Sequence, residues 1–370
     1  MSRDTFSLHA VILAGGAGER FWPRSRAHHP KPLLRVLGGE TLLGATVARA
    51  EGFAEADAIW LVCGDEHARA MRRAGGLSRR RTLVEPARRN TAMAVGLAAY
   101  RLLAEDPDAV MVVLPADHHI PDDRAFAAAV RRAARAAQRE GVLVTLGIRP
   151  TRPDTGYGYI RLGAETQGYR GLHRVGRFVE KPGAKTAARY VEGARHLWNA
   201  GIFVWRADAI AREIERCAPE LHAALAPVRR WARAPRRSPQ GSATAFQNVI
   251  ARAYRRAPSQ PIDVAVLERS RQVWCLPVQF HWSDVGTWAS LAQELGVTKT
   301  VSRVIAGEVD MNESRGNLVW GDNRPIVLLG VEGLAVIDTS DALLVAKLER
   351  SPEIKSAVAR LRNSGRRDLL

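Results

Sequence analysis

Short apolar runs alternate with segments of helical periodicity over the first 148 residues. The runs LHAVILAG, DAIWLVCG, DAVMVVLPADH and GVLVTLGI are apolar nearly throughout, which is typical of strands buried on both faces. Between them, the pattern predicts helices over residues 41–53, 91–105 and 123–140, the second with Asn90 as its N-cap. Strands that alternate with helices predict a parallel sheet covered on both faces, with ligands bound beyond the carboxyl ends of the strands.

The pattern changes after residue 150. The segments YGYIRLG, HRVGRFVEKP and LWNAGIFVWRA predict mixed or antiparallel strands around a cleft, with a short helix over residues 184–193. Residues 223–258 are rich in Arg, Ala and Pro, and predict helices joined by a mobile connector. After residue 300, short apolar runs separated by turn residues predict a small β extension and a polar terminal helix. We therefore expect an α/β domain over residues 1–295 and a C-terminal extension over residues 296–370.

The composition is that of a globular protein. The chain has 370 residues, of which 46% are hydrophobic and 25% charged, and this excludes a disordered or fibrous chain. No run approaches the ~18 apolar residues that cross a bilayer, and the start lacks the basic and apolar regions of a signal peptide. The three cysteines are scattered, which argues against a disulfide framework or a zinc site. We expect a cytoplasmic protein without a membrane partner.

The net charge of +17 points to an anionic ligand rather than to nucleic acid. Lys and Arg number 55 against 38 Asp and Glu, and only six of the 55 are lysines. The arginines are spread through alanine-rich helical segments, where such runs usually form solvated faces. We therefore expect no nucleic-acid partner, and a site for several phosphates would use part of the excess charge.

A glycine-rich turn follows the first predicted strand. In AVILAGGAGERF, Gly15, Gly16 and Gly18 lack Cβ atoms, which lets phosphate oxygens approach backbone N–H groups. A dinucleotide fingerprint would need glycine where the chain has Phe21, and the Gly-Lys-Ser/Thr of a Walker loop is absent. A tight turn of purely structural origin is the alternative.

Two cations and two carboxylates could complete a phosphate site. Arg20 and Lys31 follow the glycines closely and could neutralise a polyphosphate. Asp117 ends the third predicted strand, on the same rim as the glycines, and Asp284 lies far downstream in SDVG. Mg²⁺ needs only one or two carboxylates besides waters and substrate phosphates. Taken alone, Asp284 would more often be a loop cap or a turn residue.

The segment LAGGAGERFWPRSR, followed by Pro-Lys, resembles the signature of the nucleotide-diphospho-sugar pyrophosphorylases and is most similar to the mannose-1-phosphate guanylyltransferase family. The resemblance continues through EPARRNTAMAV, LPADHHI, GYGYI, FVEKP, WNAGIFVW, IDVAVLE, SDVGTW and the tail GVEGLAVIDTSDALLV, from about residue 9 to 348. It implies a Rossmann-like, GT-A-like α/β nucleotidyltransferase fold, in which a mixed sheet has helices on both faces. It also implies a small C-terminal β extension like a short left-handed β-helix.

The resemblance implies a reaction in which GTP and mannose 1-phosphate give GDP-mannose and pyrophosphate, by Mg²⁺-assisted in-line attack on the α-phosphorus. Arg20 and Lys31 would hold the departing phosphates, Lys181 the attacking phosphate, and Asp117 and Asp284 the Mg²⁺. The implied nucleotide-binding positions are Leu13, Ala14, Gly15, Gly16, Gly18, Glu85, Asn90, Thr91, Pro115 and Ala116. The implied sugar-binding positions are Gly158, Glu180, Asn199 and Gly201.

The sequence leaves an alternative to the sugar-site interpretation of Glu180 and Lys181. Glu180 and Lys181 are neighbours on a predicted strand, so both reach one site only if the strand twists or ends there. An exposed ion pair on a loop is the other interpretation.

Guanine has N1–H and N2–H₂ donors along one edge, and a carboxylate could accept both, which makes Glu85 the candidate for reading the base. Glu85 could equally pair with Arg88 or Arg89. The family usually has proline where this chain has Met93 and glutamine where it has Pro32. These departures leave room for another nucleotide.

Two other classes of function remain open: the same chemistry with another nucleotide or sugar 1-phosphate, and a non-catalytic regulatory paralogue. Because the sequence ends at residue 370, we do not expect the fused phosphomannose isomerase activity found in longer relatives. The sequence is compatible with a homodimer but does not determine the oligomeric state.

Overall fold

The computed structural model describes residues 6–16, 18–234 and 243–370. The connector predicted within residues 223–258 falls largely on residues 235–242, outside the described residues. The strands are β1 (Leu8–Ala14), β2 (Ile59–Gly64), β3 (Thr82–Glu85), β4 (Val110–Pro115), β5 (Leu143–Ile148), β6 (Tyr159–Glu165), β7 (His173–Val179), β8 (His196–Arg206), β9 (Val273–Val278), β10 (Arg303–Ala306), β11 (Val309–Asn312), β12 (Leu318–Trp320), β13 (Ile326–Leu329), β14 (Leu334–Asp338) and β15 (Leu343–Lys347).

The helices predicted over residues 41–53, 91–105, 123–140 and 184–193 are present, whereas the helices over residues 68–75, 207–217, 219–224 and 288–294 are not among the predicted ones. The helices are α1 (Leu42–Glu51), α2 (Ala68–Gly75), α3 (Asn90–Leu103), α4 (Asp123–Glu140), α5 (Ala184–Glu192), α6 (Ala207–Cys217), α7 (Pro219–Ala224), α8 (Ala226–Arg233), α9 (Ala243–Tyr254), α10 (Trp288–Glu294) and α11 (Ile354–Asn363). Among the described residues, no helix combines the length and the apolar character that crossing a bilayer requires.

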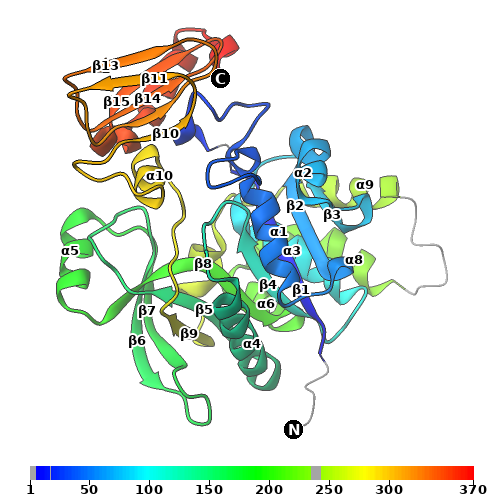
Figure 1. The fold of residues 1–370 in the computed structure, drawn as a ribbon. Coiled ribbons are helices and arrows are strands. Elements are labelled where there is room, and N and C mark those ends of the chain that lie inside the picture. The colour runs from blue at the N-terminus through cyan, green and yellow to red at the C-terminus, as the bar shows by residue number, and fades with distance from the viewer. Residues whose placement is uncertain (1–5, 17, 235–242) are drawn as a thin grey trace.

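A nine-stranded mixed sheet forms the centre of the molecule, in the order β3-β2-β1-β4-β8-β5-β9-β7-β6. The strands β1 to β4 are parallel, as the sequence predicts for β1, β2 and β4, whereas β3 is not among the predicted strands. However, β8 comes from the later segment and lies antiparallel between β4 and β5 (Figure 1). The sheet is therefore mixed, and the carboxyl ends of β1 and β4 meet the start of β8 at one edge.

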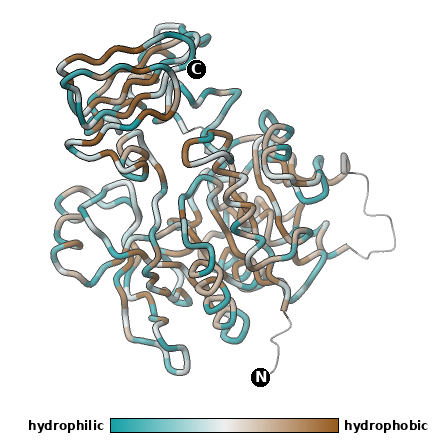
Figure 2. Tube along the Cα trace, viewed as in Figure 1, coloured by the Kyte–Doolittle hydropathy of each residue, from teal (hydrophilic) through white to brown (hydrophobic). Residues whose placement is uncertain are grey.

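Helices cover both faces of this sheet. One apolar core joins α3, α6, α8 and α9 to the sheet, with Val95 and Ile210 fully buried. The other joins α1, α2 and α4 to the opposite face, with Leu43 and Phe126 fully buried. Figure 2 shows the hydrophobic positions along the central strands and on the inward sides of these helices.

Past residue 300 the chain forms a stack of short strands. β10, β12 and β14 are parallel neighbours, β15 pairs antiparallel with β14, and β11 pairs parallel with β13. Successive parallel strands in two small sheets are the arrangement of a β-helix, as the sequence predicts, and the predicted terminal helix is α11. The boundary between the two parts at residue 295 stays a prediction.

This extension is packed against the segment that follows the glycine turn, coloured blue in Figure 1. The Trp22 indole N–H donates to the Leu369 carbonyl at 2.7 Å, and the Arg362 guanidinium pairs with Glu19 at 2.6 Å. The Trp288 indole N–H donates to the Trp22 carbonyl at 3.1 Å, and Phe21 is buried in the same apolar cluster. The last helix therefore lies directly beside the glycine-rich segment.

Candidate active site

The glycine turn lies at the carboxyl end of β1, where the sequence predicts a phosphate site. Gly18 has a φ of +66°, and a Cβ at that position would lie 2.4 Å from the Lys31 Cβ. Only glycine fits such a conformation and such a close approach. The turn therefore brings the backbone of Gly18 against Lys31, while Gly15 and Gly16 remain exposed at the rim.

A hollow of about 450 Å³, here called the central pocket, opens beside this turn. It brings together the predicted residues Gly18, Arg20, Lys31, Asp117 and Asp284. Its wall also includes Arg88 and Lys355, for which the sequence alone predicts no place in the site. Four cations thus line the pocket with three carboxylates, of which Glu19 pairs with Arg362 outside the lining.

The Lys31 ammonium joins the two aspartates. Its Nζ lies 2.8 Å from the Asp117 Oδ2 and 2.7 Å from the Asp284 carbonyl oxygen. Burial opposes ionisation of Asp117, but the charge and hydrogen bond of Lys31, together with His118 and the backbone, hold the pKa of Asp117 below its ordinary value. Asp117 is therefore a carboxylate at neutral pH, on the rim that the sequence predicts.

Asp284 is fixed by a short antiparallel bridge between His119 and Ser283, whose N–H groups donate to each other's carbonyls at 2.8 and 3.0 Å. Its Oδ1 accepts hydrogen bonds from the Tyr157 hydroxyl at 2.7 Å and from the Gly286 N–H at 3.1 Å. The Gly286 contact is the kind that a turn residue makes, and Asp284 also lines the central pocket together with Asp117. A role of Asp284 in metal binding stays a prediction.

His118 lies between the two aspartates without a catalytic geometry. Burial lowers the pKa of His118 to about 4, so the ring is neutral at pH 7. Its Nδ1 accepts a hydrogen bond from the Trp282 indole at 3.1 Å. That His118 has no catalytic role stays a prediction.

The two carboxylates fit a magnesium ion better than they fit a metal such as zinc. Among the described residues, no group of three or more His, Cys, Asp or Glu side chains could hold a metal ion. However, the Asp117 Oδ1 and the Asp284 Oδ2 have no hydrogen-bond partner among the described residues, so each carboxylate retains an oxygen for a ligand. Mg²⁺ typically takes one or two carboxylates and completes its shell with water and phosphate.

A second hollow, here called the side pocket, adjoins the central pocket through Arg88. It has a volume of about 390 Å³ and is lined by Ala14, Gly15, Glu85 and Arg88 among others. The Glu85 Oε1 accepts a hydrogen bond from the Tyr254 hydroxyl at 2.8 Å, and Arg88 pairs instead with Glu66 at 2.7 Å. The alternative in which Glu85 pairs with Arg88 or Arg89 is therefore wrong.

Other predicted nucleotide-binding residues differ in their placement. Leu13 and Pro115 are partners in the register of β1 and β4, and the Ala116 N–H donates to the Leu13 carbonyl at 3.1 Å, so all three lie at the same edge. Asn90 and Thr91 line neither pocket. The Thr91 hydroxyl accepts the Ile262 N–H at 2.9 Å, which is a structural contact.

Asn90 does not act as the predicted N-cap but is the first residue of α3, with a φ of +63°. Its Oδ1 accepts the N–H of Thr91 at 2.8 Å. The helix therefore begins one residue before the position that an Asn90 cap would give.

The predicted sugar-binding residues form one cluster. β7 ends at Val179, so the strand stops just before Glu180 and Lys181, and their ion pair measures 2.7 Å from Oε1 to Nζ. A Cβ on Gly158 would lie 2.5 Å from the Glu180 Oε2 and 3.3 Å from the Asn199 Cβ, so a side chain there would displace the Glu180 carboxylate. The exposed ion pair is present, and the strand ends where a shared site would require it to end. A joint role of Glu180 and Lys181 in one site stays a prediction.

Gly201 lies between this cluster and the strand ends that precede Asp117. Its φ is +66°, and a Cβ there would face Pro115 and His118 at 3.7 and 3.8 Å. The Gly201 N–H donates to the Asn199 Oδ1 at 3.1 Å, which orients the Asn199 amide. The sugar cluster and the central pocket are thus held by the same strand, β8.

Asp263 belongs to this cluster, although the sequence distinguishes it only as part of IDVAVLE. The Asn199 amide donates to the Asp263 Oδ1 at 2.7 Å. Burial, together with the nearby Glu180 charge, raises the pKa of Asp263 to about 7. The segment that resembles the family was the signal that could have identified it.

This raised pKa predicts a pH-dependent stability. The folded chain keeps the Asp263 proton up to about pH 7, whereas an unfolded aspartate ionises near ~3.9, so stability falls between these values as the pH rises. Asp263→Asn keeps an acceptor for Asn199 and removes this penalty. We expect the variant to gain on the order of a few kcal/mol in unfolding free energy at pH 8 and clearly less at pH 5.

Urea unfolding of both proteins at the two pH values measures this difference. Asp310→Asn, at an exposed position of the extension, is the control and should show no such dependence. An equal gain at both pH values would contradict the assignment.

Two known protein families match parts of this chain. The nucleotidyl transferase family matches residues 9–296, and the MannoseP isomerase/GMP-like beta-helix domain matches residues 307–361. The second match supports the β-helix arrangement of the extension, and together the two cover most of the chain.

Individual relatives agree over nearly the whole chain. Mannose-1-phosphate guanylyltransferase of Escherichia coli K12 is 35% identical over 369 residues, covering 98% of this chain and 75% of the relative. Alginate biosynthesis protein AlgA of Pseudomonas aeruginosa is 35% identical over 359 residues, covering 96% of this chain and 72% of the relative.

A solved structure shares the fold at similar identity. It is described as a mannose-1-phosphate geranyltransferase from Thermus thermophilus, is 34% identical, and has a TM-score of 0.84. The match covers 96% of this chain and all of the other. From these matches and the site geometry, the chain belongs to the mannose-1-phosphate guanylyltransferase family of nucleotidyl transferases.

Proposed function

We propose that this chain converts GTP and mannose 1-phosphate into GDP-mannose and pyrophosphate. The observation that carries the proposal is the central pocket, where four cations surround two aspartates next to a side pocket that ends in Glu85. A nucleoside triphosphate is complementary to these two pockets, because it has a polar base at one end and a chain of anionic phosphates at the other. The relative from Escherichia coli K12 is named mannose-1-phosphate guanylyltransferase, after the same reaction.

In the proposed step, a phosphate oxygen of mannose 1-phosphate forms a bond to the α-phosphorus of GTP. The bond from the α-phosphorus to the bridging oxygen breaks in line with it, and pyrophosphate leaves with that electron pair. The nucleophile is already an anion, so no general base is needed. Catalysis then depends on aligning two anions and on stabilising the charge that develops at phosphorus.

The side chains divide this work by position. Arg20 and Lys31 hold the departing phosphates. Lys181 breaks its ion pair with Glu180 and holds the phosphate of mannose 1-phosphate. The Lys181 side chain is 60% exposed, which leaves it able to turn toward a substrate. The Asn199 amide donates hydrogen bonds to the sugar hydroxyls, and the Glu180 carboxylate accepts hydrogen bonds from them.

Asp117 and Asp284 would hold the Mg²⁺ through the carboxylate oxygens that no described residue occupies. When bound, the ion neutralises phosphate charge and polarises the phosphoryl group. Lys31 keeps the two aspartates close together by contacting both, so the ligands for the ion are arranged in advance.

Pyrophosphate release is the direct test of this function. The assay contains Mg²⁺ and pairs each of GTP, ATP, UTP and dTTP with mannose 1-phosphate or glucose 1-phosphate. Release that requires GTP and mannose 1-phosphate supports the proposal. Release with another pair would keep the chemistry and replace the substrates, and no release from folded protein would favour the regulatory paralogue.

Glu85→Gln should weaken the preference for GTP. The amide keeps the size of the side chain but can accept only one of the two guanine donors, and its own N–H₂ opposes the other. Burial raises the pKa of Glu85 while Tyr254 opposes the shift, so the carboxyl is sensitive to low pH. We expect kcat/KM for GTP to fall about 10- to 100-fold, the value of a hydrogen bond to a charged group.

Kinetics with GTP and ATP measure this effect, because loss of base reading should not lower the rate with ATP. Tyr254→Phe is the matched variant: it removes the hydroxyl that orients Glu85 but keeps the carboxylate. A Glu85→Gln enzyme with an unchanged ratio of GTP to ATP rates would rule out the role of Glu85.

Lys355 supplies a cation from the C-terminal extension to the same phosphates. It lies in α11 and lines the central pocket, as Lys31 does, although the chain has only six lysines. We expect Lys355→Gln to raise the KM for GTP about tenfold and to leave the KM for mannose 1-phosphate unchanged. The expected change is smaller than for loss of a buried contact, because Lys355 is exposed.

Steady-state kinetics with each substrate varied in turn give this result. Lys347→Gln removes a similarly exposed lysine at the end of β15 and should behave as wild type. An unchanged KM for GTP in Lys355→Gln would remove the extension from the substrate site. A cytoplasmic location and a homodimer stay predictions from the sequence.

A further inference from the structure

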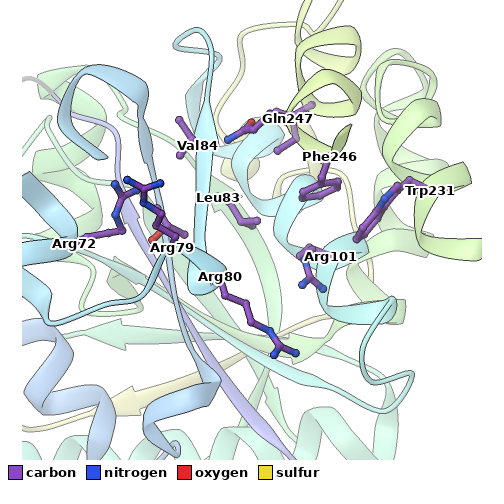
Figure 3. Close-up of a pocket in the computed structure, with 11 residues that line it drawn as sticks. Arg72, Arg79, Arg80, Leu83, Val84, Arg101, Trp231, Phe246 and Gln247 are labelled. Carbon is purple, nitrogen blue, oxygen red and sulfur yellow. The ribbon is translucent and has the colours of Figure 1, made fainter. Parts of the chain in front are cut away.

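A third hollow, here called the arginine pocket, lies on the far side of β3 from the sheet centre. It has a volume of about 540 Å³ and is enclosed by β3, α2, α3, α8 and α9 (Figure 3). Its polar wall consists of Arg72, Arg79, Arg80 and Arg101. It shares no residue with the central pocket or the side pocket.

The positive charge of this pocket is poorly neutralised. Arg72 and Arg79 form no ion pair with any described residue, and in Figure 3 their side chains lie on the same side of the pocket. Arg80 comes no closer than 3.8 Å to the Glu105 carboxylate, which already bonds Arg101 at 2.7 Å. Several uncompensated guanidinium groups in one concave site attract an anion.

Arg101 provides a buried donor without an acceptor. Its Nη2 donates to Glu105, but its Nη1 is buried and has no hydrogen-bond partner among the described residues. A native structure rarely leaves such a group unsatisfied, so an acceptor from outside the chain is the simplest explanation. An anionic oxygen in the pocket would meet this need.

The opposite wall is aromatic. The rings of Trp231 and Phe246 are 4.1 Å apart, and the Arg101 guanidinium lies 5.5 and 6.0 Å from their centres. Figure 3 shows these two rings across the pocket from Arg72 and Arg79. Cations on one side and flat apolar groups on the other suit a ligand with phosphates at one end and a ring at the other, and the volume is typical of small-molecule sites.

Two walls of the arginine pocket extend to the side pocket. β3 lines the arginine pocket through Leu83 and ends at Glu85, and α9 lines it through Phe246 and ends at Tyr254. The hydrogen bond from Tyr254 to Glu85 joins these two ends. A ligand that shifts α9 against β3 therefore acts on the carboxylate assigned to the base.

We propose that the arginine pocket is a second, regulatory nucleotide site that takes a nucleoside diphosphate and alters GTP binding through Glu85 and Tyr254. The regulatory part rests on the proposed function, whereas the binding part does not. Arg72 and Arg79 hold the phosphates, Arg101 contributes its buried Nη1, and Trp231 contacts the base.

Calorimetric titration with GDP tests the binding. We expect two equivalents of GDP for the wild-type chain and one for Arg72→Gln/Arg79→Gln. The control is Arg124→Gln/Arg135→Gln, which removes the same charge from exposed positions of α4 and should keep two equivalents. Pyrophosphate is titrated in parallel, and it should not occupy the second site with the affinity of GDP.

One equivalent in both proteins would overturn the proposal, and so would loss of the second equivalent in the α4 control. Equal binding of pyrophosphate would show an anion site without nucleoside recognition and would also overturn it. In turnover assays, GDP should inhibit the wild-type enzyme with a mixed pattern against GTP and the Arg72→Gln/Arg79→Gln variant purely competitively. If no substrate pair turned over, the titrations would still decide the binding part.

Discussion

Replacing Lys31 by methionine should lower kcat about 10²- to 10³-fold, the range seen when one preorganised donor to a transition state is removed. Methionine keeps much of the apolar stem of this side chain, which is 5% exposed, but it removes the ammonium that contacts Asp117 and the Asp284 carbonyl. The departing phosphates lose a cation, and the Asp117 carboxylate and the Asp284 carbonyl lose the group that joins them.

The same change should also affect stability, because the Asp117 carboxylate loses the ammonium partner that lies 2.8 Å away. We expect the free energy of unfolding to fall by about 1–3 kcal/mol, the cost of leaving a charged acceptor unsatisfied. The double variant Lys31→Met/Asp117→Asn should regain part of that stability and remain inactive. Turnover near the wild-type rate in Lys31→Met, measured at saturating substrates, would show that Lys31 is a structural residue only.

Lys181→Ala should lower turnover by about 100-fold or more, with almost no change in stability. The side chain is 60% exposed and pairs with the adjacent Glu180, so the folded chain does not depend on it. The loss should appear in kcat as well as in the KM for mannose 1-phosphate, because the attacking phosphate would be both weakly bound and misaligned.

Lys185→Ala is the matched control, since Lys185 is an exposed lysine four positions further on, in α5. It should keep normal kinetics. Thermal unfolding of both variants should match the wild type, so that any loss in Lys181→Ala reflects chemistry and not folding. Near-normal turnover of Lys181→Ala at saturating substrates would refute the assigned role.

The sequence was sufficient for those parts of the site that lie at the ends of regular elements. Asp117 follows a buried strand, and Gly18 follows the first one, so the rule for parallel sheets places both on one rim. Glu180 and Lys181 could share a site only if their strand ended there, and β7 ends at Val179. The local sequence pattern is enough to locate a candidate site residue when that residue lies at the end of a strand.

The remaining features depend on contacts between distant segments, which periodicity does not encode. The insertion of β8 between β4 and β5 follows from long-range antiparallel pairing. The partner of Glu85 is Tyr254 from α9 and not a neighbour in sequence. Lys355 joins the central pocket only because α11 packs beside Glu19 and Phe21, and nothing in the terminal helix itself indicates a substrate.

In the proposed complex, the packing of α11 beside the glycine turn makes the substrate a cross-link between the first and last parts of the chain. A nucleotide that contacts both Arg20 and Lys355 binds only when the terminal helix is docked, so its binding energy is added to the energy of docking. Hydrogen exchange in residues 354–363 should therefore slow when GTP is present, although most of the nucleotide lies on the central sheet. The fraying of this helix and the affinity for the nucleotide are two measures of one equilibrium.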